Sequence, residues 1–358
     1  MAADRGNEAR HAATREAMRR AVEQGVPGVT GQARDVRGTW NGAAGVADLT
    51  TQRPRGAGER YRIGSITKTF VATVLLQLEA EAKLDLDDTV DRWLPGAVQG
   101  HGHDGRRITV RQVLNQTSGI HDYLADPGFA QRVLTENFLE HRDETWTRDQ
   151  LLATAMKHRP DFEPGTGWHY SNTNYLLAGM VIEKVTGRPY GEEIDRRVIK
   201  RLGLRSTSLP GTDRTLPAPS ARAYTRFGGG PDATAYDVTE FNPSWASSAG
   251  EMISTSADLN RFVTALLGGE LLPPAQLREM KTTVSAEKEY PGERYGLGLI
   301  RKRLSCGTVV WGHDGGLHGS HSQAVTTEDA RHSMAFNFNT DRAGDLGAVL
   351  DAEFCGPR

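Results

Sequence analysis

The chain has 358 residues, of which 37% are hydrophobic and 25% charged, enough to bury a core in one large unit or two. Its formal net charge is −2, from 43 Lys and Arg against 45 Asp and Glu, so no overall field would recruit nucleic acid or an anionic membrane. No apolar run approaches the roughly 18 residues of a membrane span. The polar start "MAADRGNEAR" lacks a signal-peptide pattern and looks like a mature secreted chain behind an added methionine, so we expect an extracellular protein.

The first part of the chain predicts a helix, a pair of strands and a second helix. Apolar residues at helical spacing predict a helix over residues 8–24, ended by glycines. Alternation interrupted by glycines predicts two short antiparallel strands within residues 28–48. The stretch from Ser65 to Leu84 is strongly helical and apolar, which indicates a buried central helix.

The middle of the chain, residues 85–240, predicts helices separated by long loops. A short helix is expected to end at Gly119 and a longer one at Gly187. The stretch "RFGGGPDAT", residues 226–234, predicts a flexible loop tip. A further helix follows, with Ser256 as its expected N-cap.

The last part of the chain predicts a strand meander and a final helix, over residues 295–302, 307–315, 320–329, 332–339 and 344–354. We therefore expect an α+β fold, in which both chain ends build one antiparallel sheet flanked by helices, with a helical subdomain. In this interpretation residues 8–356 form a single unit. Its sheet-and-helix subdomain takes residues 8–85 and 241–356, and its helical subdomain takes residues 86–240.

The first motif is Ser65-Ile66-Thr67-Lys68, at the entry to the central helix. Residues three apart lie on one face of a helix, so the Lys68 amine is expected beside the Ser65 hydroxyl. A serine needs such a neighbour because its own hydroxyl is almost never ionised near neutral pH. A chain of this length yields about one S-x-x-K by chance, so the motif needs partners.

The second motif is Tyr170-Ser171-Asn172, which precedes a helix. A phenol and an amide two residues apart on an extended stretch point the same way; the phenol can relay a proton and the amide can hold a substrate carbonyl. Helix capping by Ser171 or Asn172 is the alternative, but capping leaves Tyr170 unexplained.

The third motif is His313-Asp314-Gly315-Gly316, after the predicted strand "GTVVW". The histidine could polarise Tyr170, and the glycines would let a substrate backbone approach the strand. Asp-Gly is also a common hairpin signal, so a simple turn is the alternative.

Taken together the motifs carry a family resemblance. Ser65 precedes Tyr170 by 105 residues (170 − 65), and Tyr170 precedes His313 by 143 (313 − 170). An S-x-x-K, Y-S-N and H-x-G triplet in this order resembles the penicillin-recognising serine hydrolases, which include class C β-lactamases, soluble DD-carboxypeptidases and D-amino-acid peptidases. Stretches such as "YRIGSITKTF", "YSNTNYLLAGMVIEK" and "LSCG" are similar to secreted actinomycete DD-carboxypeptidases, from about residue 15 to Cys355.

The resemblance implies a β-lactamase-like fold, no cofactor and a set of site residues. Ser65 would be the acylated nucleophile, Lys68 and Tyr170 would share general-base and general-acid work, and His313 would support the proton relay. Substrate contacts would come from Asn172 on the substrate amide, from a lining tryptophan and from the third motif, namely Trp245, Asp314 and Gly315. The backbone N–H groups of Ser65 and Gly316 would form the oxyanion hole.

Two cysteines, Cys306 and Cys355, lie in the last sixth of the chain. Without a C-x-x-C or a nearby ligand set they argue against zinc or thiol redox chemistry. The residues alone leave two buried thiols or one disulfide open. In the actinomycete relative the matching cysteines are bridged, so the resemblance implies a disulfide.

The chain departs from the DD-carboxypeptidases at two substrate-binding places. There a threonine after the motif histidine and an arginine after "GLGL" hold the free carboxylate of the substrate. This sequence has Asp314 and Ile300 at those places, with Arg301 one step later. A one-residue step turns a strand side chain to the opposite face, so we expect no carboxypeptidase activity unless the strand bulges. The alternative is that Asp314 points to solvent or pairs with Arg301.

These observations predict a serine hydrolase that acts on D-residue amides, esters or peptides through an acyl-enzyme. The alternatives are a DD-carboxypeptidase or β-lactamase-like esterase, a peptide-cyclising acyltransferase, and a non-catalytic penicillin-binding relative. The partner would be a small molecule or peptide with a D-residue. His101, His103 and Asp104 lie in a Gly-rich loop with no distant partner, so we expect no metal site; His318 and His321 could line the pocket or lie exposed.

Overall fold

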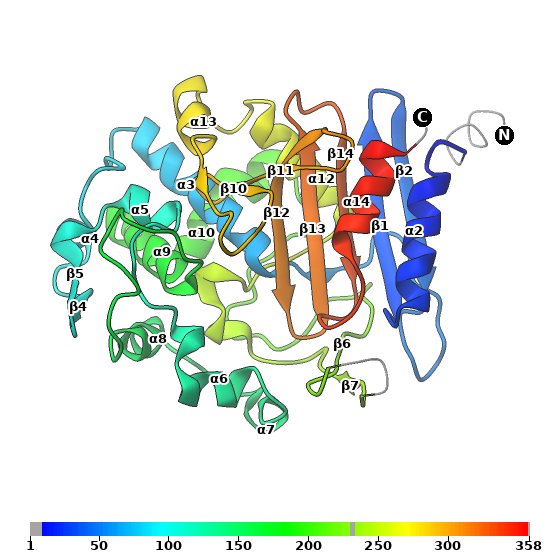
Figure 1. The fold of residues 1–358 in the computed structure, drawn as a ribbon, viewed down its shortest axis with the longest axis horizontal. Coiled ribbons are helices and arrows are strands. Elements are labelled where there is room, and N and C mark those ends of the chain that lie inside the picture. The colour runs from blue at the N-terminus through cyan, green and yellow to red at the C-terminus, as the bar shows by residue number, and fades with distance from the viewer. Residues whose placement is uncertain (1–8, 230–232, 357–358) are drawn as a thin grey trace.

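The structure of the protein, a computed structural model, describes residues 9–229 and 233–356. Its centre is an eight-stranded antiparallel sheet in the order β2-β1-β14-β13-β12-β11-β10-β9 (Figure 1). The two chain ends meet where β1 pairs with β14, with Val29 opposite Phe338. The predicted sheet from both ends is therefore confirmed. The strands are β1 Gly28–Asp35, β2 Gly38–Gly45, β9 Val284–Ser285, β10 Glu293–Tyr295, β11 Ile300–Arg303, β12 Val309–Leu317, β13 Ser320–Thr327 and β14 Ser333–Phe338.

The two terminal helices, α2 (Ala12–Glu23) and α14 (Leu346–Cys355), lie side by side on one face of the sheet (Figure 1). Strand residues alternate between faces, so Phe336 and Phe338 pack with these helices while Ala335 faces the larger core on the other side. On that side α12 (Ser256–Leu267) packs against β1, β13 and β14.

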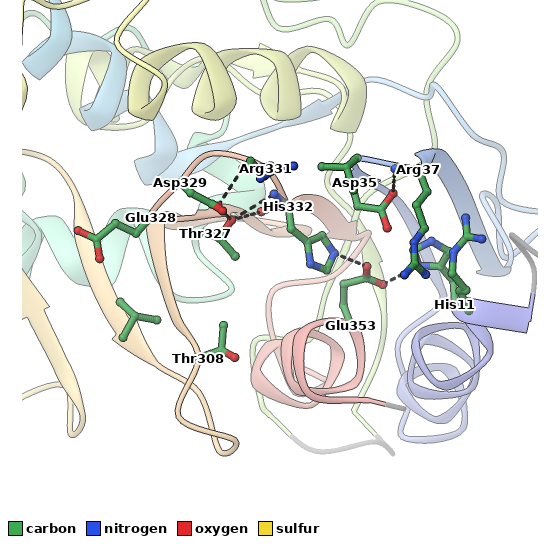
Figure 2. Close-up of a pocket in the computed structure, with 13 residues that line it drawn as sticks. His11, Asp35, Arg37, Thr308, Thr327, Glu328, Asp329, Arg331, His332 and Glu353 are labelled. Carbon is green, nitrogen blue, oxygen red and sulfur yellow. Dashed lines mark hydrogen bonds and ion pairs between the residues drawn. The ribbon is translucent and has the colours of Figure 1, made fainter. Parts of the chain in front are cut away.

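A buried carboxylate joins the two terminal helices to the sheet (Figure 2). Glu353 on α14 accepts hydrogen bonds from His11 at 3.0 Å, Thr14 at 2.7 Å and His332 at 2.7 Å. Burial works against the charged form, but these hydrogen bonds outweigh it and lower the pKa of Glu353 to about 2. The carboxylate therefore stays ionised and stabilises the packing of α2 on α14.

The predicted central helix is α3 (Thr67–Ala80), entered through a 3-10 turn at Gly64–Ile66. It is buried over most of its length and packs against α9 (Asn172–Thr186). Further helices are α4 Val90–Trp93, α5 Val110–Leu114, α6 Pro127–Val133, α7 Phe138–His141, α8 Arg148–Ala155, α10 Tyr190–Ile194, α11 Lys200–Leu202 and α13 Pro274–Met280. Two-stranded pairs are β3 Tyr61–Arg62 with β8 Ile253–Ser254, β4 Gln99–Gly100 with β5 His103–Asp104, and β6 Tyr224–Thr225 with β7 Tyr236–Asp237.

Four local predictions need correction or qualification. The strand predicted over 295–302 is two paired strands, β10 and β11, because Gly298 takes a φ of +66° and turns the chain. The N-cap of α12 is Thr255, whose side chain accepts from Asp258 N, rather than Ser256. The helix expected to end at Gly119 already ends at Leu114. Of the loop predicted over 226–234, residues 230–232 lie outside the described residues. The division into two subdomains stays a prediction.

A disulfide joins Cys306, which follows β11, to Cys355 at the end of α14, as the resemblance implied. In the described ranges no helix is long and apolar enough to cross a membrane.

Candidate active site

The fold brings the first and third motifs into direct backbone contact. Gly64, with φ +52°, precedes Ser65, and a Cβ on it would lie 2.7 Å from Gly316 N. A Cβ on Gly315 would lie 1.9 Å from Ile63 O and 2.8 Å from Ser65 N. Side chains are therefore excluded where β12 meets the entry to α3, and this contact fixes Ser65 beside Gly316.

Lys68 is fully buried behind Ser65. Its Nζ lies 2.8 Å from Ser65 Oγ, 2.8 Å from Asn172 Oδ1 and 2.7 Å from Ala249 O. Burial lowers the pKa of Lys68 to about 7, although the nearby carboxylates of Asp122 and Asp314 act to raise it. Near neutral pH a large fraction of Lys68 is therefore an unprotonated amine in contact with the serine, which is what a general base requires.

Tyr170 lies against the same serine. Burial raises the pKa of its phenol well above the usual range, and the nearby Ser65 hydroxyl opposes this rise. The phenol oxygen is buried and makes no well-directed hydrogen bond within the described residues, and Lys68 Nζ lies 4.9 Å from the ring centre. Tyr170 is thus a protonated phenol with a free donor beside the nucleophile.

Asn172 is fixed by a residue that sequence reasoning missed, Asp122. The Asn172 amide donates to Asp122 from its side chain at 3.0 Å and from its backbone at 3.2 Å, while its Oδ1 accepts from Lys68. Burial raises the pKa of Asp122. Asp122 stands in a loop with no motif spacing, so the sequence carried no signal for it. The second N–H of the Asn172 amide is left for a ligand.

His313 is buried on β12 and its ring nitrogens are both occupied. Nε2 lies 2.9 Å from the Tyr295 hydroxyl and Nδ1 lies 2.6 Å from the carbonyl oxygen of Asp314. Because that carbonyl only accepts, Nδ1 carries the proton and Nε2 accepts from Tyr295. Burial lowers the pKa of His313 to about 4, so it is neutral near pH 7. Its ring and that of Tyr170 are in contact at 6.3 Å between ring centres, but the hydrogen bond of its Nε2 goes to Tyr295 instead.

Two cavities meet at Ser65, Tyr170 and Gly316. One, of about 350 Å³, includes the predicted Trp245 and Asn172. The other, of about 120 Å³, includes the predicted Ile300 and Asp314. The first is also lined by Tyr123, Leu124, Leu134, Leu317 and His318, and the second by Ala286, Tyr290, Glu293, Arg294 and Tyr295. The nucleophile therefore stands between a larger, partly aromatic cavity and a smaller, partly acidic one.

The remaining candidate residues lie apart or at the edge. His321 lines a neighbouring cavity that also contains Asp314. His103 is buried and His101 is exposed, far from Ser65 in the sequence and not among the residues lining its cavities. Within the described ranges, no three His, Cys, Asp or Glu side chains gather as a metal site.

The sequence matches the family described as "Beta-lactamase" over residues 11–353. A D-stereospecific amidohydrolase from Streptomyces sp. superposes with a TM-score of 0.92 at 57% identity, covering 97% of this chain and 99% of that one. The D-amino acid amidase of Ochrobactrum anthropi SV3, complexed with D-phenylalanine, gives 0.83 at 29% identity, covering 96% and 98%.

Two curated relatives are longer than this chain. Penicillin-binding protein 4* of Bacillus subtilis is 27% identical over 315 residues, which is 83% of this chain and 64% of that protein. The D-aminopeptidase of Cereibacter sphaeroides is 28% identical over 334 residues, which is 91% and 59%. The chain thus spans less than two thirds of the length of either.

Proposed function

Because the chain belongs to the β-lactamase family of serine hydrolases, we propose that it hydrolyses D-aminoacyl amides and esters through an acyl-enzyme on Ser65. The observation that carries the proposal is the buried Lys68 amine, with a pKa near 7, at 2.8 Å from Ser65 Oγ. A serine hydroxyl becomes a nucleophile only when a base can take its proton. No extra group is needed for this step, since the base is already in contact.

The reaction follows from the positions of four groups. Neutral Lys68 takes the proton of Ser65 Oγ as Oγ attacks the substrate carbonyl. The N–H groups of Ser65 and Gly316 stabilise the resulting oxyanion. The C–N bond then breaks as Tyr170 gives its proton to the leaving amine, and Lys68 returns a proton to Tyr170. Water attacks the acyl-enzyme with the same base, releasing the acid and free Ser65.

The D-configuration of the substrate is supported by the relatives. The relative at 57% identity is described as a D-stereospecific amidohydrolase, and the one at 29% as a D-amino acid amidase, which has been solved with both D- and L-phenylalanine. In this chain the larger cavity, with Trp245, Tyr123 and Leu124, suits an aromatic or branched acyl side chain. We therefore place the acyl side chain there and the leaving group in the smaller cavity.

We also propose that the protein works outside the cell or in another oxidising compartment. Its support is the Cys306–Cys355 disulfide, because disulfides persist in oxidising compartments and are rare in the reducing cytosol. Recovery of the protein from the medium of its natural host, with the bridge intact, tests this; finding it reduced in the cytosol would contradict it.

The catalytic proposal is tested with D- and L-phenylalanine amide, for wild type and Ser65→Ala. We expect ammonia release from the D-amide, little from the L-amide and none from the variant, whose fold should survive because the change removes at most a helix-end contact, about 1 kcal/mol. Equal turnover of both enantiomers would remove the D-specific part of the proposal. No turnover of any amide or ester, with no adduct on Ser65, would favour the non-catalytic alternative.

A further inference from the structure

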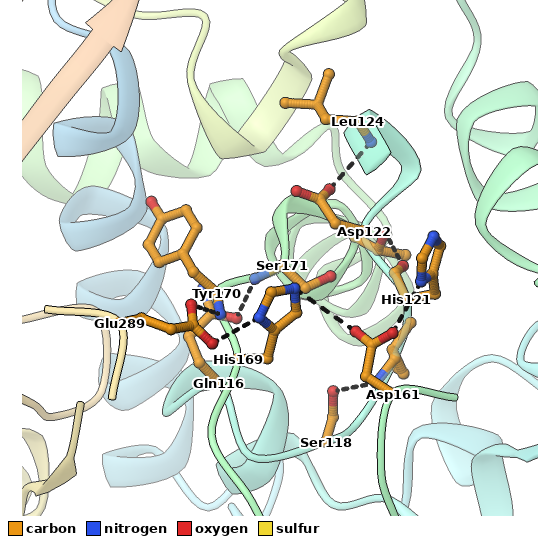
Figure 3. A network of polar contacts seen from close by, with 12 residues as sticks. Gln116, Ser118, His121, Asp122, Leu124, Asp161, His169, Tyr170, Ser171 and Glu289 are labelled. Atoms are coloured by element: carbon orange, nitrogen blue, oxygen red, sulfur yellow. Dashed lines mark hydrogen bonds and ion pairs between the residues drawn. The ribbon is translucent and has the colours of Figure 1, made fainter. Parts of the chain in front are cut away.

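A chain of polar contacts runs along the outer side of the second motif (Figure 3). His169, the residue before Tyr170, lies 2.6 Å from Glu289 Oε1 through its Nδ1, and 3.7 Å from Asp161 Oδ2 through its Nε2. Asp161 in turn lies 2.9 Å from His121, the residue before Asp122. The catalytic proposal uses none of His121, Asp161, His169 and Glu289.

Glu289 also touches the tyrosine segment directly. Its Oε2 accepts from Tyr170 N at 3.4 Å, while its Oε1 is held by His169. The Glu289 carboxylate thus bonds to two successive residues, His169 and Tyr170. The Glu289 side chain is 26% exposed and the His169 side chain 41%, so the contact is partly buried.

The residue after Glu289 forms a wall of the smaller cavity. Tyr290 and Ala286 line that cavity together with Ser65, Ile300 and Asp314. The Tyr290 ring packs edge-on against Trp168 at 5.8 Å and against Tyr170 at 6.2 Å. Tyr290 is one of the two large hydrophobic side chains exposed in the described part of the chain. Its position over the cavity therefore depends on contacts with its neighbours rather than on burial.

The loop between β9 and β10, residues 286–292, has few other anchors. Its backbone N–H groups make local bonds: Glu289 N and Tyr290 N donate to Ala286 O, and Gly292 N donates to the Glu287 carboxylate. These bonds shape the loop but do not tie it to the helical side of the site. The hydrogen bonds of Glu289 to His169 and to Tyr170 N connect the loop to that side.

Resting on the proposed function, we propose that Glu289 is a positioning residue that straps the 286–292 loop to the Tyr170 segment and so limits the size of the leaving group. The strap places Tyr290 over the cavity of about 120 Å³ beside Ser65. A volume of this order suits ammonia or a small alcohol better than an aromatic amine. Cutting the strap would let Tyr290 move away and widen the cavity.

The experiment compares wild type, Glu289→Ala, His169→Ala, His169→Asn and Lys288→Ala. Lys288 is exposed on the same loop and is the matched control; Asn at position 169 can place an amide nitrogen where Nδ1 stands and restore the bond to Glu289. Each protein is given D-phenylalanine amide, with a small leaving group, and D-phenylalanine p-nitroanilide, with a large one. Hydrogen–deuterium exchange of residues 286–292 is followed in parallel, which needs no activity.

We expect Glu289→Ala and His169→Ala to raise the ratio of kcat/KM for the anilide to that for the amide about tenfold, and to speed exchange of the loop by a similar factor, as loss of one charge-assisted hydrogen bond implies. His169→Asn and Lys288→Ala should leave both readouts near wild type. An unchanged exchange rate in Glu289→Ala would overturn the inference, and so would an equal loss on both substrates. If wild type turns over neither substrate, the catalytic proposal fails, and exchange alone still decides whether the strap exists.

Discussion

Ile300 and Asp314 face the same cavity beside Ser65 from two neighbouring strands. Ile300 pairs with Gly312, and Asp314 lies two residues further along β12, on the same face. Arg301 turns the other way and lies over the Trp311 ring at 5.9 Å. No bulge brings Arg301 back, so it does not replace the arginine that carboxypeptidases use at this place.

This relationship predicts poor binding of a free substrate carboxylate. A carboxylate about 4 Å from Asp314 would meet a repulsion on the order of 4 kcal/mol at an effective dielectric of 20. Wild type should therefore favour D-phenylalanine amide over an acyl-D-Ala-D-Ala peptide in kcat/KM. Ile300→Arg/Asp314→Thr should shift that ratio toward the peptide by at least about tenfold.

Arg294 also lines this cavity, and a free guanidinium there could bind a substrate carboxylate in spite of Asp314. Its guanidinium is bonded to Thr283 Oγ1 at 2.8 Å and to Thr283 O at 3.0 Å. Arg294→Ala should therefore leave the preference unchanged. A wild-type preference for the free-carboxylate peptide would contradict the assignment of Asp314.

The pKa of Lys68 predicts how Ser65 reactivity depends on pH. The neutral amine is the base, so reactivity should be low below the pKa of Lys68, about 7, and rise to a plateau above it. The rate of labelling by a neutral fluorophosphonate measures this without a titrating substrate. A rate that stays flat between about pH 5.5 and 9 would contradict the role of Lys68.

Asp122→Asn should move the midpoint of that profile to lower pH. The Asp122 carboxylate favours the ammonium form of Lys68 and so raises its pKa, whereas burial lowers it. Removing the charge of Asp122 therefore lowers the pKa of Lys68 further. Asn offers one accepting oxygen where Asp offers two, so it can keep the bonds from the backbone N–H groups of Asn172 and Leu124 and loses the bond from the Asn172 side chain. Asp149→Asn, at an exposed position, is the control and should not shift the profile; a midpoint that rises in Asp122→Asn would refute the coupling.

The disulfide predicts a measurable contribution to stability. Cys306 and Cys355 are 49 residues apart in sequence, and closing a loop of this length in the unfolded chain is worth about 4 kcal/mol in the chain-entropy estimate. Cys306→Ala/Cys355→Ala should lower the free energy of unfolding toward that value in a denaturant titration. Two free thiols in oxidised wild-type protein would show that the bridge is absent in solution.

Glu353 predicts a loss of stability in acid. Its pKa falls from 4.5 to about 2 on folding, so its contribution is fully present above pH 4.5 and disappears as the pH falls toward about 2. The contribution is up to about 3 kcal/mol. Glu353→Gln should lower stability at neutral pH and flatten this acid dependence, whereas Glu240→Gln, at an exposed position, should not. Equal slopes for Glu353→Gln and wild type would contradict the buried carboxylate's role.

The sequence predicted those parts of the site that depend on short-range spacing. Ser65 and Lys68 are three residues apart at a helix entry, and the Tyr170 to Asn172 stretch leads into α9, so their relative placement follows from local geometry. The tail of the chain was likewise predicted as strands, and it forms β12, β13 and β14, with the terminal helices on one face of the sheet and α12 on the other.

Contacts between distant loops could not be predicted in the same way. Asp122 and Glu289 are single acids in irregular segments. Asp122 lies 50 residues from Asn172 in the sequence, and Glu289 lies 119 residues from Tyr170, so only the folded chain brings each pair into contact. His313 was expected to assist Tyr170, but its Nε2 accepts from Tyr295, which lies on β10, one strand beyond β11 in the sheet. β10 and β11 pair because the chain turns at Gly298, whereas the sequence predicts one continuous strand through "YGLGL".

The most direct test of the account is the mass of the intact protein during turnover. Wild type is mixed with a D-phenylalanine ester, quenched in acid within the first turnovers and compared with Ser65→Ala treated alike. We expect a D-phenylalanyl adduct on wild type that maps to the peptide containing Ser65, decays as substrate is consumed and is missing from the variant. An adduct on another residue, or full turnover by Ser65→Ala, would contradict it.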